Sequence, residues 1–158
     1  MIDIAEESMV ETKLNLVCSA CQAVNRVPTT RLSDRPICGK CKQSLVPDHP
    51  VELNDDNFQK FISKTDLPVV VDFWASWCPP CKAMTPAFNA AAGILASAVI
   101  LAKLSTEESP RTAESLGIQG IPCLIAFQNN SEIARQSGAM PTDQIVAWVR
   151  SLPWQPMA

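Results

Sequence analysis

The chain has 158 residues and a formal net charge of −3; 47% of its residues are hydrophobic and 18% are charged. This length suffices for one ordinary domain and a small additional one, and the composition excludes general disorder. No run approaches the ~18 consecutive apolar residues of a membrane-spanning helix.

The first residues, MIDIAEESMVE, are acidic and lack the basic and apolar regions of a signal peptide. We expect residues 1–13 to form a flexible acidic tail on a cytoplasmic protein that does not associate with membranes. In a reducing compartment, a CxxC pair more often binds metal or carries redox equivalents than links the fold covalently. The seven cysteines are therefore candidates for function.

Residues 14–46 contain two cysteine pairs, CSAC and CGKC, separated by 16 residues. This spacing matches a tetrahedral zinc site, and four thiolates leave no coordination position open for a substrate. We expect a small zinc-binding domain in which one structural zinc is held by Cys18, Cys21, Cys38 and Cys41. Iron in the same four-sulfur geometry, or two cysteine pairs without metal, are the alternatives.

The same part of the chain is basic, with six Lys and Arg against two Asp in residues 13–50. A basic segment can bind nucleic acid. A zinc ion with four thiolates adds a charge of roughly −2, however, and offsets half of this excess. We therefore do not expect nucleic-acid binding, and a mildly basic face for another partner stays open.

Residues 47–52 form a linker with two prolines and the only histidine, and helix and strand signals alternate in the main domain, residues 53–158. We predict a short helix within 53–64, capped by Asn54 or Asp55, a buried strand at 67–75, a helix at 81–98 and a second buried strand at 99–105. A short helix at 109–117, a hairpin of strands 123–128 and 132–138, and an amphipathic helix at 140–152 follow. This order implies an α/β domain whose mixed sheet carries helices on both faces.

The third cysteine pair, Cys78 and Cys81 in WASWCPPC, lies where strand 67–75 gives way to the long helix. Only Cys123 is left over, so the chain cannot form a second four-cysteine metal site. The start of a helix stabilises a thiolate on Cys78, and Pro79 favours an extended Cys78 with its sulfur at the surface. Cys81, one turn later, is more shielded and placed to attack a mixed disulfide on Cys78. The position predicts a redox pair.

Two stretches in order, VVVDFWASWCPPCKAMTP and GIQGIPCLIAFQNNSEIARQSGAMP, resemble the active-site segment and the downstream half of thioredoxins. The resemblance covers about residues 51–152, and the four-cysteine segment before it is similar to the zinc-containing bacterial type, thioredoxin-2. It implies the thioredoxin fold behind a zinc-ribbon-like domain. It also implies a thiol–disulfide oxidoreductase that reduces disulfide-containing proteins, and we expect a monomer.

The resemblance implies roles for individual residues. Cys78 matches the attacking cysteine and Cys81 the resolving one. Asp72 matches a buried aspartate that exchanges a proton with Cys81 through water, and its place in an apolar run should raise its pKa. Lys103 matches the lysine near that aspartate. The alternative is that Asp72 and Lys103 form a buried ion pair with no part in catalysis.

Pro122 matches the cis-proline that faces the active-site disulfide, where the backbone of Ile121 would bond an extended substrate. The apolar rim that receives the partner matches Trp77, Ile121, Gly138 and Ala139. Trp74 matches a residue that supports packing. The resemblance further implies a flavin-containing, NADPH-dependent thioredoxin reductase as electron donor, so that this chain itself holds no organic cofactor.

The chain also departs from the family pattern. Pro79 and Pro80 replace the usual Gly-Pro, as in tryparedoxin- and nucleoredoxin-like relatives, and residues between the cysteines affect the redox potential. Cys123 replaces a common threonine, either as a small buried residue or as a third redox-active thiol able to trap Cys78. Two alternative functions follow: a tryparedoxin-like or isomerase-like oxidoreductase with a shifted potential, or a zinc-ribbon binding protein with a redox-inert thioredoxin-like domain.

Overall fold

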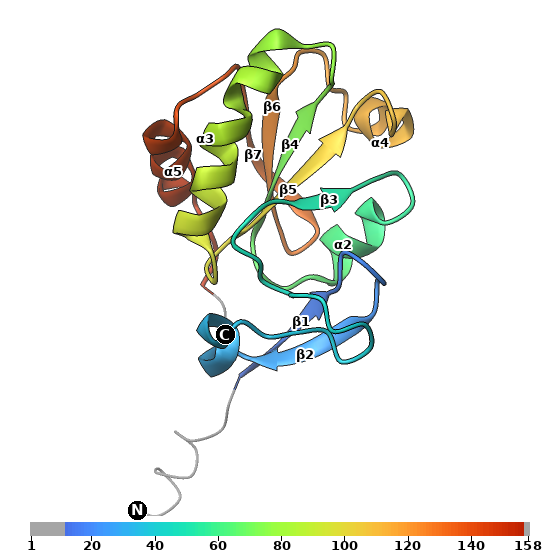
Figure 1. Cartoon of the computed structure of the whole chain (residues 1–158), viewed down its shortest axis with the longest axis vertical. Helices are drawn as coiled ribbons and strands as arrows, with labels where there is room; N and C mark the ends of the chain where they lie inside the picture. The colour runs from blue at the N-terminus through green and yellow to red at the C-terminus, as the bar shows by residue number, and fades with distance from the viewer. Residues whose placement is uncertain (1–11, 157–158) are drawn as a thin grey trace, which may run out of the picture.

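The computed structural model of the protein describes residues 12–156 (Figure 1). The expected acidic tail, residues 1–13, therefore lies almost entirely outside the described residues. Within them, no helix is both long enough and apolar enough to cross a membrane.

The cysteine-rich segment is built on a two-stranded hairpin that the sequence analysis did not predict. Strand β1 (Lys13–Val17) pairs antiparallel with β2 (Val24–Pro28), and the 3-10 helix η1 (Thr29–Asp34) follows. The turn between β1 and β2 carries the first cysteine pair. The second pair lies in another turn, closed by a bridge between Ile37 and Ser44.

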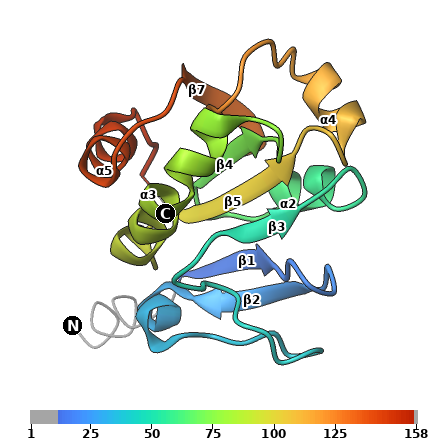
Figure 2. The same cartoon turned by 45° about the horizontal axis from the view of Figure 1, so that its top comes forward.

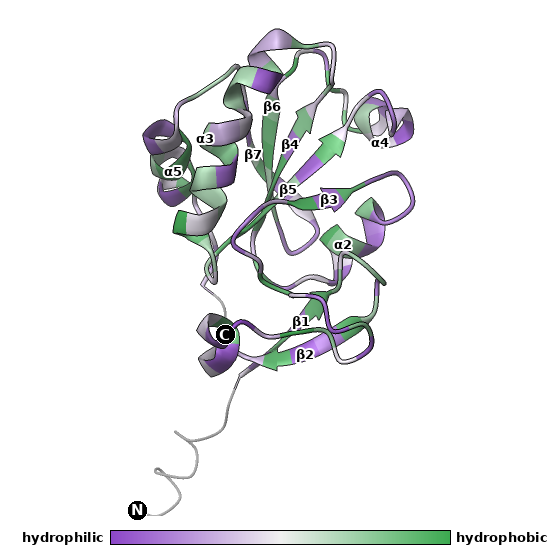
Figure 3. Ribbon diagram, in the orientation of Figure 1, coloured by the Kyte–Doolittle hydropathy of each residue, from purple (hydrophilic) through white to green (hydrophobic). Residues whose placement is uncertain are grey.

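The main domain contains a five-stranded sheet in the order β3-β5-β4-β6-β7. Its strands are β3 (Val51–Leu53), β4 (Val69–Trp74), β5 (Ile100–Ser105), β6 (Cys123–Gln128) and β7 (Ser131–Ser137). The first three run parallel, while β6 is antiparallel to β4 and β7 is antiparallel to β6. The predicted mixed sheet is confirmed, and its central strands are its most hydrophobic part (Figure 3).

Helices cover both faces of this sheet, as predicted (Figures 1 and 2). Helices α3 (Pro79–Leu95) and α5 (Thr142–Ser151) lie on one face, and α2 (Phe58–Lys64) and α4 (Pro110–Ser115) on the other. Because side chains alternate along a strand, β4 serves both layers. Val71 packs in the cluster that contains the aromatic residues of α2, and Val70 packs with Met84 of α3.

The expected cap of the first helix of the main domain, Asn54 or Asp55, is wrong, because the N-cap residue of α2 is Asn57. Asn54 Oδ1 accepts the N–H groups of Asp56 and Asn57, which closes a turn before α2 begins at Phe58. Asp55 instead caps α4: its carboxylate accepts the N–H groups of Arg111 at 3.2 Å and Thr112 at 2.8 Å. These partners come from another helix, so local sequence gave no sign of them.

The long helix also differs from its prediction at both ends. It begins at Pro79 instead of residue 81, because the first helical positions need no N–H partner and accept both prolines. It ends at Leu95 instead of residue 98, and Ser97 has a φ of 76° that a helix cannot contain. The earlier start places Cys78 at the N-cap of the helix.

The cysteine-rich segment packs directly against the α2 side of the main domain. Leu14, Leu16 and Val17 are buried in the same hydrophobic cluster as Phe58 and Phe61. Backbone bonds reinforce this contact: the N–H of Asn15 donates to Asp66 Oδ2 at 2.6 Å, and the N–H of Asp66 donates to the Asn15 carbonyl at 2.8 Å. The hairpin and the α2 face of the sheet therefore share one core.

Candidate active site and metal centre

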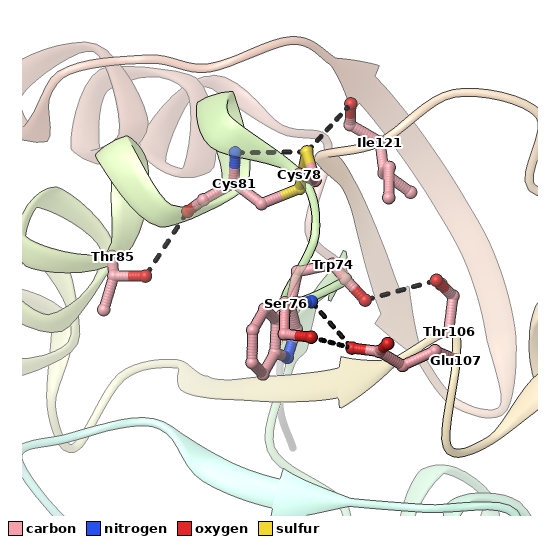
Figure 4. Close-up of a disulfide and its surroundings, with 8 residues drawn as sticks. All are labelled: Trp74, Ser76, Cys78, Cys81, Thr85, Thr106, Glu107 and Ile121. Carbon is pink, nitrogen blue, oxygen red and sulfur yellow. Dashed lines mark hydrogen bonds between the residues drawn. A yellow bond between two sulfur atoms is a disulfide. The ribbon is translucent and has the colours of Figure 1, made fainter.

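The pair Cys78 and Cys81 forms a disulfide at the junction of β4 and α3 (Figure 4). Cys78 is the N-cap residue of α3, and Pro79 and Pro80 occupy the first helical positions. The N–H of Cys81 donates to the sulfur of Cys78 at 3.3 Å. This N–H and the positive end of the helix dipole both favour negative charge on that sulfur.

Both cysteines are shielded in this disulfide form. Cys78 is only 3% exposed, less than the predicted surface position, and Cys81 is 1% exposed. The sulfur of Cys78 lies 3.9 Å from the carbonyl oxygen of Ile121, which packs against the pair together with Trp74. Trp77, directly before the disulfide, is 67% exposed. A large apolar side chain therefore lies open to solvent at the mouth of the site.

The loop before β6 faces the disulfide. The peptide bond between Ile121 and Pro122 is cis, as the resemblance implies. The N–H of Gly138 donates to the Pro122 carbonyl at 2.9 Å, which brings the end of β7 to this loop. Gly138 has a φ of 100°, a backbone conformation that favours glycine. Ala139, the next residue, is exposed. The structure thus brings Ile121, Gly138 and Ala139 to one side of the site.

Asp72 is a buried carboxyl group beneath the site. It is 1% exposed and lies on the face of β4 that α3 covers, the side on which Cys81 lies. Burial raises the pKa of Asp72 to about 7, against the opposing effect of the nearby Lys103 ammonium. Its Oδ1 has no hydrogen-bond partner among the described residues. The group can therefore gain or lose a proton near neutral pH.

Lys103 lies beside Asp72 in the sheet but does not bond to it. The two residues are register partners on β5 and β4. The ammonium of Lys103 instead lies over the ring of Trp74, with Nζ 4.5 Å from the ring centroid. No ion pair between Lys103 and Asp72 occurs among the described residues. The alternative interpretation, a direct buried ion pair between Asp72 and Lys103, is therefore not supported.

Two residues that the sequence pattern does not indicate, Thr106 and Glu107, hold the segment before Cys78. The N–H and hydroxyl of Thr106 donate to the Trp74 carbonyl at 2.8 and 3.2 Å. The N–H and hydroxyl of Ser76 donate to Glu107 Oε1 at 2.7 and 2.5 Å (Figure 4). Thr106 and Glu107 lie in the loop after β5. Their only local signal is that polar residues follow a strand at the edge where the cysteines lie.

Cys123 does not lie beside the active-site pair. It is buried with Ile125 and Phe127 in the cluster on the α2 face of the sheet. Burial raises the pKa of its thiol. The sheet therefore separates Cys123 from Cys78, which argues against a third thiol that traps Cys78.

The remaining four cysteines form a compact cluster. Their Sγ atoms all lie within 4.8 Å of one another, and they belong to Cys18, Cys21, Cys38 and Cys41. Two of the sulfur–sulfur distances are 3.4 and 3.6 Å. A tetrahedral ion with Zn–S bonds of ~2.3 Å places its sulfurs roughly 3.8 Å apart. The donor set and its geometry therefore fit zinc, and thiolates are ligands that zinc prefers.

N–H donors around Cys38 support the thiolate form that a metal requires. The backbone N–H groups of Cys41 and Lys40, together with the side-chain amide of Asn25, lower the pKa of Cys38 in spite of burial. Asn25 Nδ2 lies 3.5 Å from the sulfur, and Asn25 Oδ1 accepts the N–H of Gly39. Asn25 therefore orients the second cysteine turn. The cysteine spacing does not indicate Asn25, because this residue lies on strand β2 and outside both cysteine pairs.

Both parts of the chain match known protein families. Residues 49–151 match the family model described as Thioredoxin, and residues 17–43 match the zinc-ribbon model described as Thioredoxin 2, N-terminal. The chain is 44% identical to Thioredoxin C-3 of Corynebacterium nephridii over 134 residues, 85% of this chain and 92% of that protein. It is 36% identical to a thioredoxin of Rhodospirillum rubrum over 100 residues, 63% of this chain and 96% of that protein. A thioredoxin of Alicyclobacillus acidocaldarius is 42% identical over 95 residues, 60% of this chain and 90% of that protein.

Proposed function

Because the chain belongs to the thioredoxin family of protein-disulfide oxidoreductases, we propose that Cys78 and Cys81 are its redox couple and that it reduces disulfides of other proteins. The observation that carries this proposal is the disulfide at the N-terminus of α3, with the Cys81 N–H on the sulfur of Cys78. This geometry stabilises one thiolate and keeps a second sulfur within bonding distance of it.

The reaction consists of two thiol–disulfide exchanges. The Cys78 thiolate attacks one sulfur of the substrate disulfide, which forms a mixed disulfide and releases the other substrate sulfur as a thiolate. The Cys81 thiol then loses its proton and attacks the sulfur of Cys78. This step closes the Cys78–Cys81 disulfide and releases the second substrate thiolate. Two electrons pass from the protein to the substrate, which is left as a dithiol.

Asp72 accepts the proton of Cys81 in the second exchange. Its buried position and its pKa of about 7 suit a group that must be ionised to act as a base and protonated afterwards. The proton travels through water, which links the carboxyl to the thiol. Lys103 modulates this carboxyl by charge from its place over Trp74.

Protein substrates bind across the rim of the disulfide. An extended segment of the substrate pairs with the backbone at Ile121, beside Pro122, in the manner of an added strand. The surrounding rim consists of Trp77, Ile121, Gly138 and Ala139. The exposure of Trp77 and Ala139 supports this assignment, because both offer apolar surface next to the cysteines. The oxidised protein is reduced again by an NADPH-dependent thioredoxin reductase, which carries the flavin.

The cysteine cluster holds one structural zinc ion per chain. Four sulfurs complete a tetrahedral shell and leave no position for substrate. Its role is to order a segment whose apolar residues contribute to the shared core. We propose a zinc domain that extends to residue 46 and a thioredoxin domain that follows it. The expected linker 47–52 is shorter than predicted, because Val51 and Glu52 belong to β3 (Val51–Leu53) and pair with β5 in the main sheet.

An insulin-reduction assay tests the redox couple. Cys78→Ser is expected to abolish turnover, and Cys81→Ser is expected to accumulate mixed disulfides that gel electrophoresis without reductant detects. Cys123→Ala is the matched control, since that thiol lies on the other face of the sheet, and it should retain wild-type activity. Full turnover by Cys78→Ser would contradict the proposal. The equilibrium constant with glutathione then distinguishes a reductase from an enzyme with a shifted potential.

A further inference from the structure

The segment that leads from β4 to Cys78 is fastened to the loop after β5. Thr106 binds the Trp74 carbonyl through two bonds, and Glu107 Oε1 accepts both donors of Ser76 (Figure 4). Ser76 and Glu107 are 31 positions apart in the chain. A single carboxylate oxygen therefore fixes both the backbone and the side chain of the residue that precedes Trp77.

The bonds to Glu107 are charge-assisted, and such bonds are roughly twice as strong as neutral ones. The hydroxyl of Ser76 has the larger effect and its backbone N–H the smaller one; together they lower the pKa of Glu107 against the opposing effect of desolvation. The carboxylate is therefore ionised at neutral pH. The neighbouring Glu108 is exposed, and its backbone N–H donates to Ser105 Oγ at 3.3 Å.

Ser76 and Trp77 lie between two buried residues, Ala75 and Cys78. Trp77 is 67% exposed, so side-chain burial contributes little to its position. The turn itself is closed by one long bond, from the N–H of Cys78 to the Ala75 carbonyl at 3.2 Å. The position of Trp77 therefore depends on the anchored Ser76, whereas Cys78 is held by its own burial and disulfide.

We propose that Glu107 is a positioning residue of the redox site, which holds Ser76 so that Trp77 is presented to protein substrates. This inference rests on the proposed function of Cys78 and Cys81. Glu107 touches neither sulfur and acts only through Ser76.

The test compares wild type, Glu107→Ala, Glu107→Gln and Glu108→Ala with two substrates, insulin and the small linear hydroxyethyl disulfide. Loss of the anchor is expected to lower kcat/KM of Glu107→Ala for insulin by about fivefold to tenfold, mainly through KM. For hydroxyethyl disulfide, which does not need the rim, the loss should stay below about twofold. Glu107→Gln keeps an acceptor oxygen without the charge, so its bonds to Ser76 are weaker and its loss should lie between those of wild type and Glu107→Ala.

Glu108→Ala is the matched control, because it removes the same charge one residue further along and leaves the anchor intact; it should behave as wild type. Ser76→Ala removes only the hydroxyl bond and should give an intermediate loss. Wild-type kinetics of Glu107→Ala would overturn the inference. An equal loss in Glu107→Gln and Glu107→Ala would also overturn it, because charge and not position would then be responsible. Failure of wild type itself to reduce insulin would instead refute the proposed function.

Discussion

The ammonium of Lys103 lies on the ring face of Trp74, with Nζ 4.5 Å from the ring centroid, although its register partner across the sheet is the carboxyl of Asp72. An aromatic face attracts a cation without requiring the carboxyl to be ionised. Trp74 thereby keeps a positive charge near Asp72 but out of contact with it. The buried carboxyl retains a raised pKa that a direct ion pair would lower.

Replacing Trp74 should shift the titration of Asp72. In Trp74→Leu the ammonium of Lys103 loses its aromatic partner and can approach the carboxyl, so the pKa of Asp72 should fall below its present value of about 7. Titration of the Asp72 carboxyl carbon by NMR measures this directly. Trp74→Phe keeps a ring face and should give a smaller shift, and Lys103→Met should move the pKa upward. A higher pKa in Trp74→Leu would contradict this account.

The pKa of Asp72 also makes stability depend on pH. Its ordinary value is 3.8 and its folded value is about 7, so the folded state binds the proton more tightly. Stability from this group is complete below pH ~4 and is lost as pH rises toward about 7. Asp72→Asn, which cannot ionise, should gain stability over wild type across this window, by up to about 4 kcal/mol at pH 8.

Urea unfolding at pH 4.5, 6 and 8 measures the difference between Asp72→Asn and wild type. The exposed Asp34→Asn serves as the matched control and should show no comparable trend. A difference that stays constant over the three pH values would argue against a raised pKa. Insulin reduction by Asp72→Asn should also be slower, because Cys81 loses the group that accepts its proton.

Asp55 connects the start of α2 to the start of α4, so its removal should loosen α4. Its carboxylate accepts two backbone N–H groups there, and the adjacent Ser109 makes no side-chain cap. Asp55→Ala should lower the unfolding midpoint by about 2–4 °C at neutral pH. Calorimetry measures this, and Asp56→Ala, at an exposed neighbour, should have little effect.

The effect of Asp55 should also fade in acid. Burial alone would raise its pKa, but the bonds from Thr112 and Arg111 hold the pKa below the ordinary value of 3.8. Stability from a carboxyl with a lowered pKa is present above its unfolded value and is lost as pH falls through the folded value. Wild type and Asp55→Ala should therefore converge below pH 3.8. A gap that widens in acid would be inconsistent with this cap.

Loss of metal should destabilise the thioredoxin domain as well as the cysteine-rich segment. Leu16 and Val17 precede Cys18 directly and share a core with Phe58 and Phe61 of α2. Chelation or Cys38→Ser should lower the unfolding midpoint on the order of 10 °C, with loss of one zinc per chain. Calorimetry with metal analysis tests this; Cys123→Ala should retain its metal. Two independent transitions, with the main one unchanged, would show that the shared core carries no coupling.

Much of the site could be predicted because its signals are local. A cysteine pair at a strand-to-helix junction, with prolines at the first helical positions, specifies an N-cap sulfur whatever the rest of the chain does. The two CxxC turns likewise predict the four metal ligands from their spacing, and the four sulfur atoms lie within 4.8 Å of one another. The alternation of helix and strand patterns was enough for the mixed sheet, since each pattern depends only on near neighbours.

The tertiary structure alone decided which distant groups meet. Asp55 caps a helix 57 positions away, Glu107 anchors Ser76 from 31 positions away, and Asp66 holds the backbone of Asn15 from 51 positions away. Strand alternation, once the register was set, put Cys123 on the face opposite the disulfide. The sequence by itself therefore determined which cysteines carry the chemistry, because the CxxC spacing within a single turn brings each pair of sulfurs together. The surroundings that tune that chemistry depend on loops and register, which only the folded chain brings together.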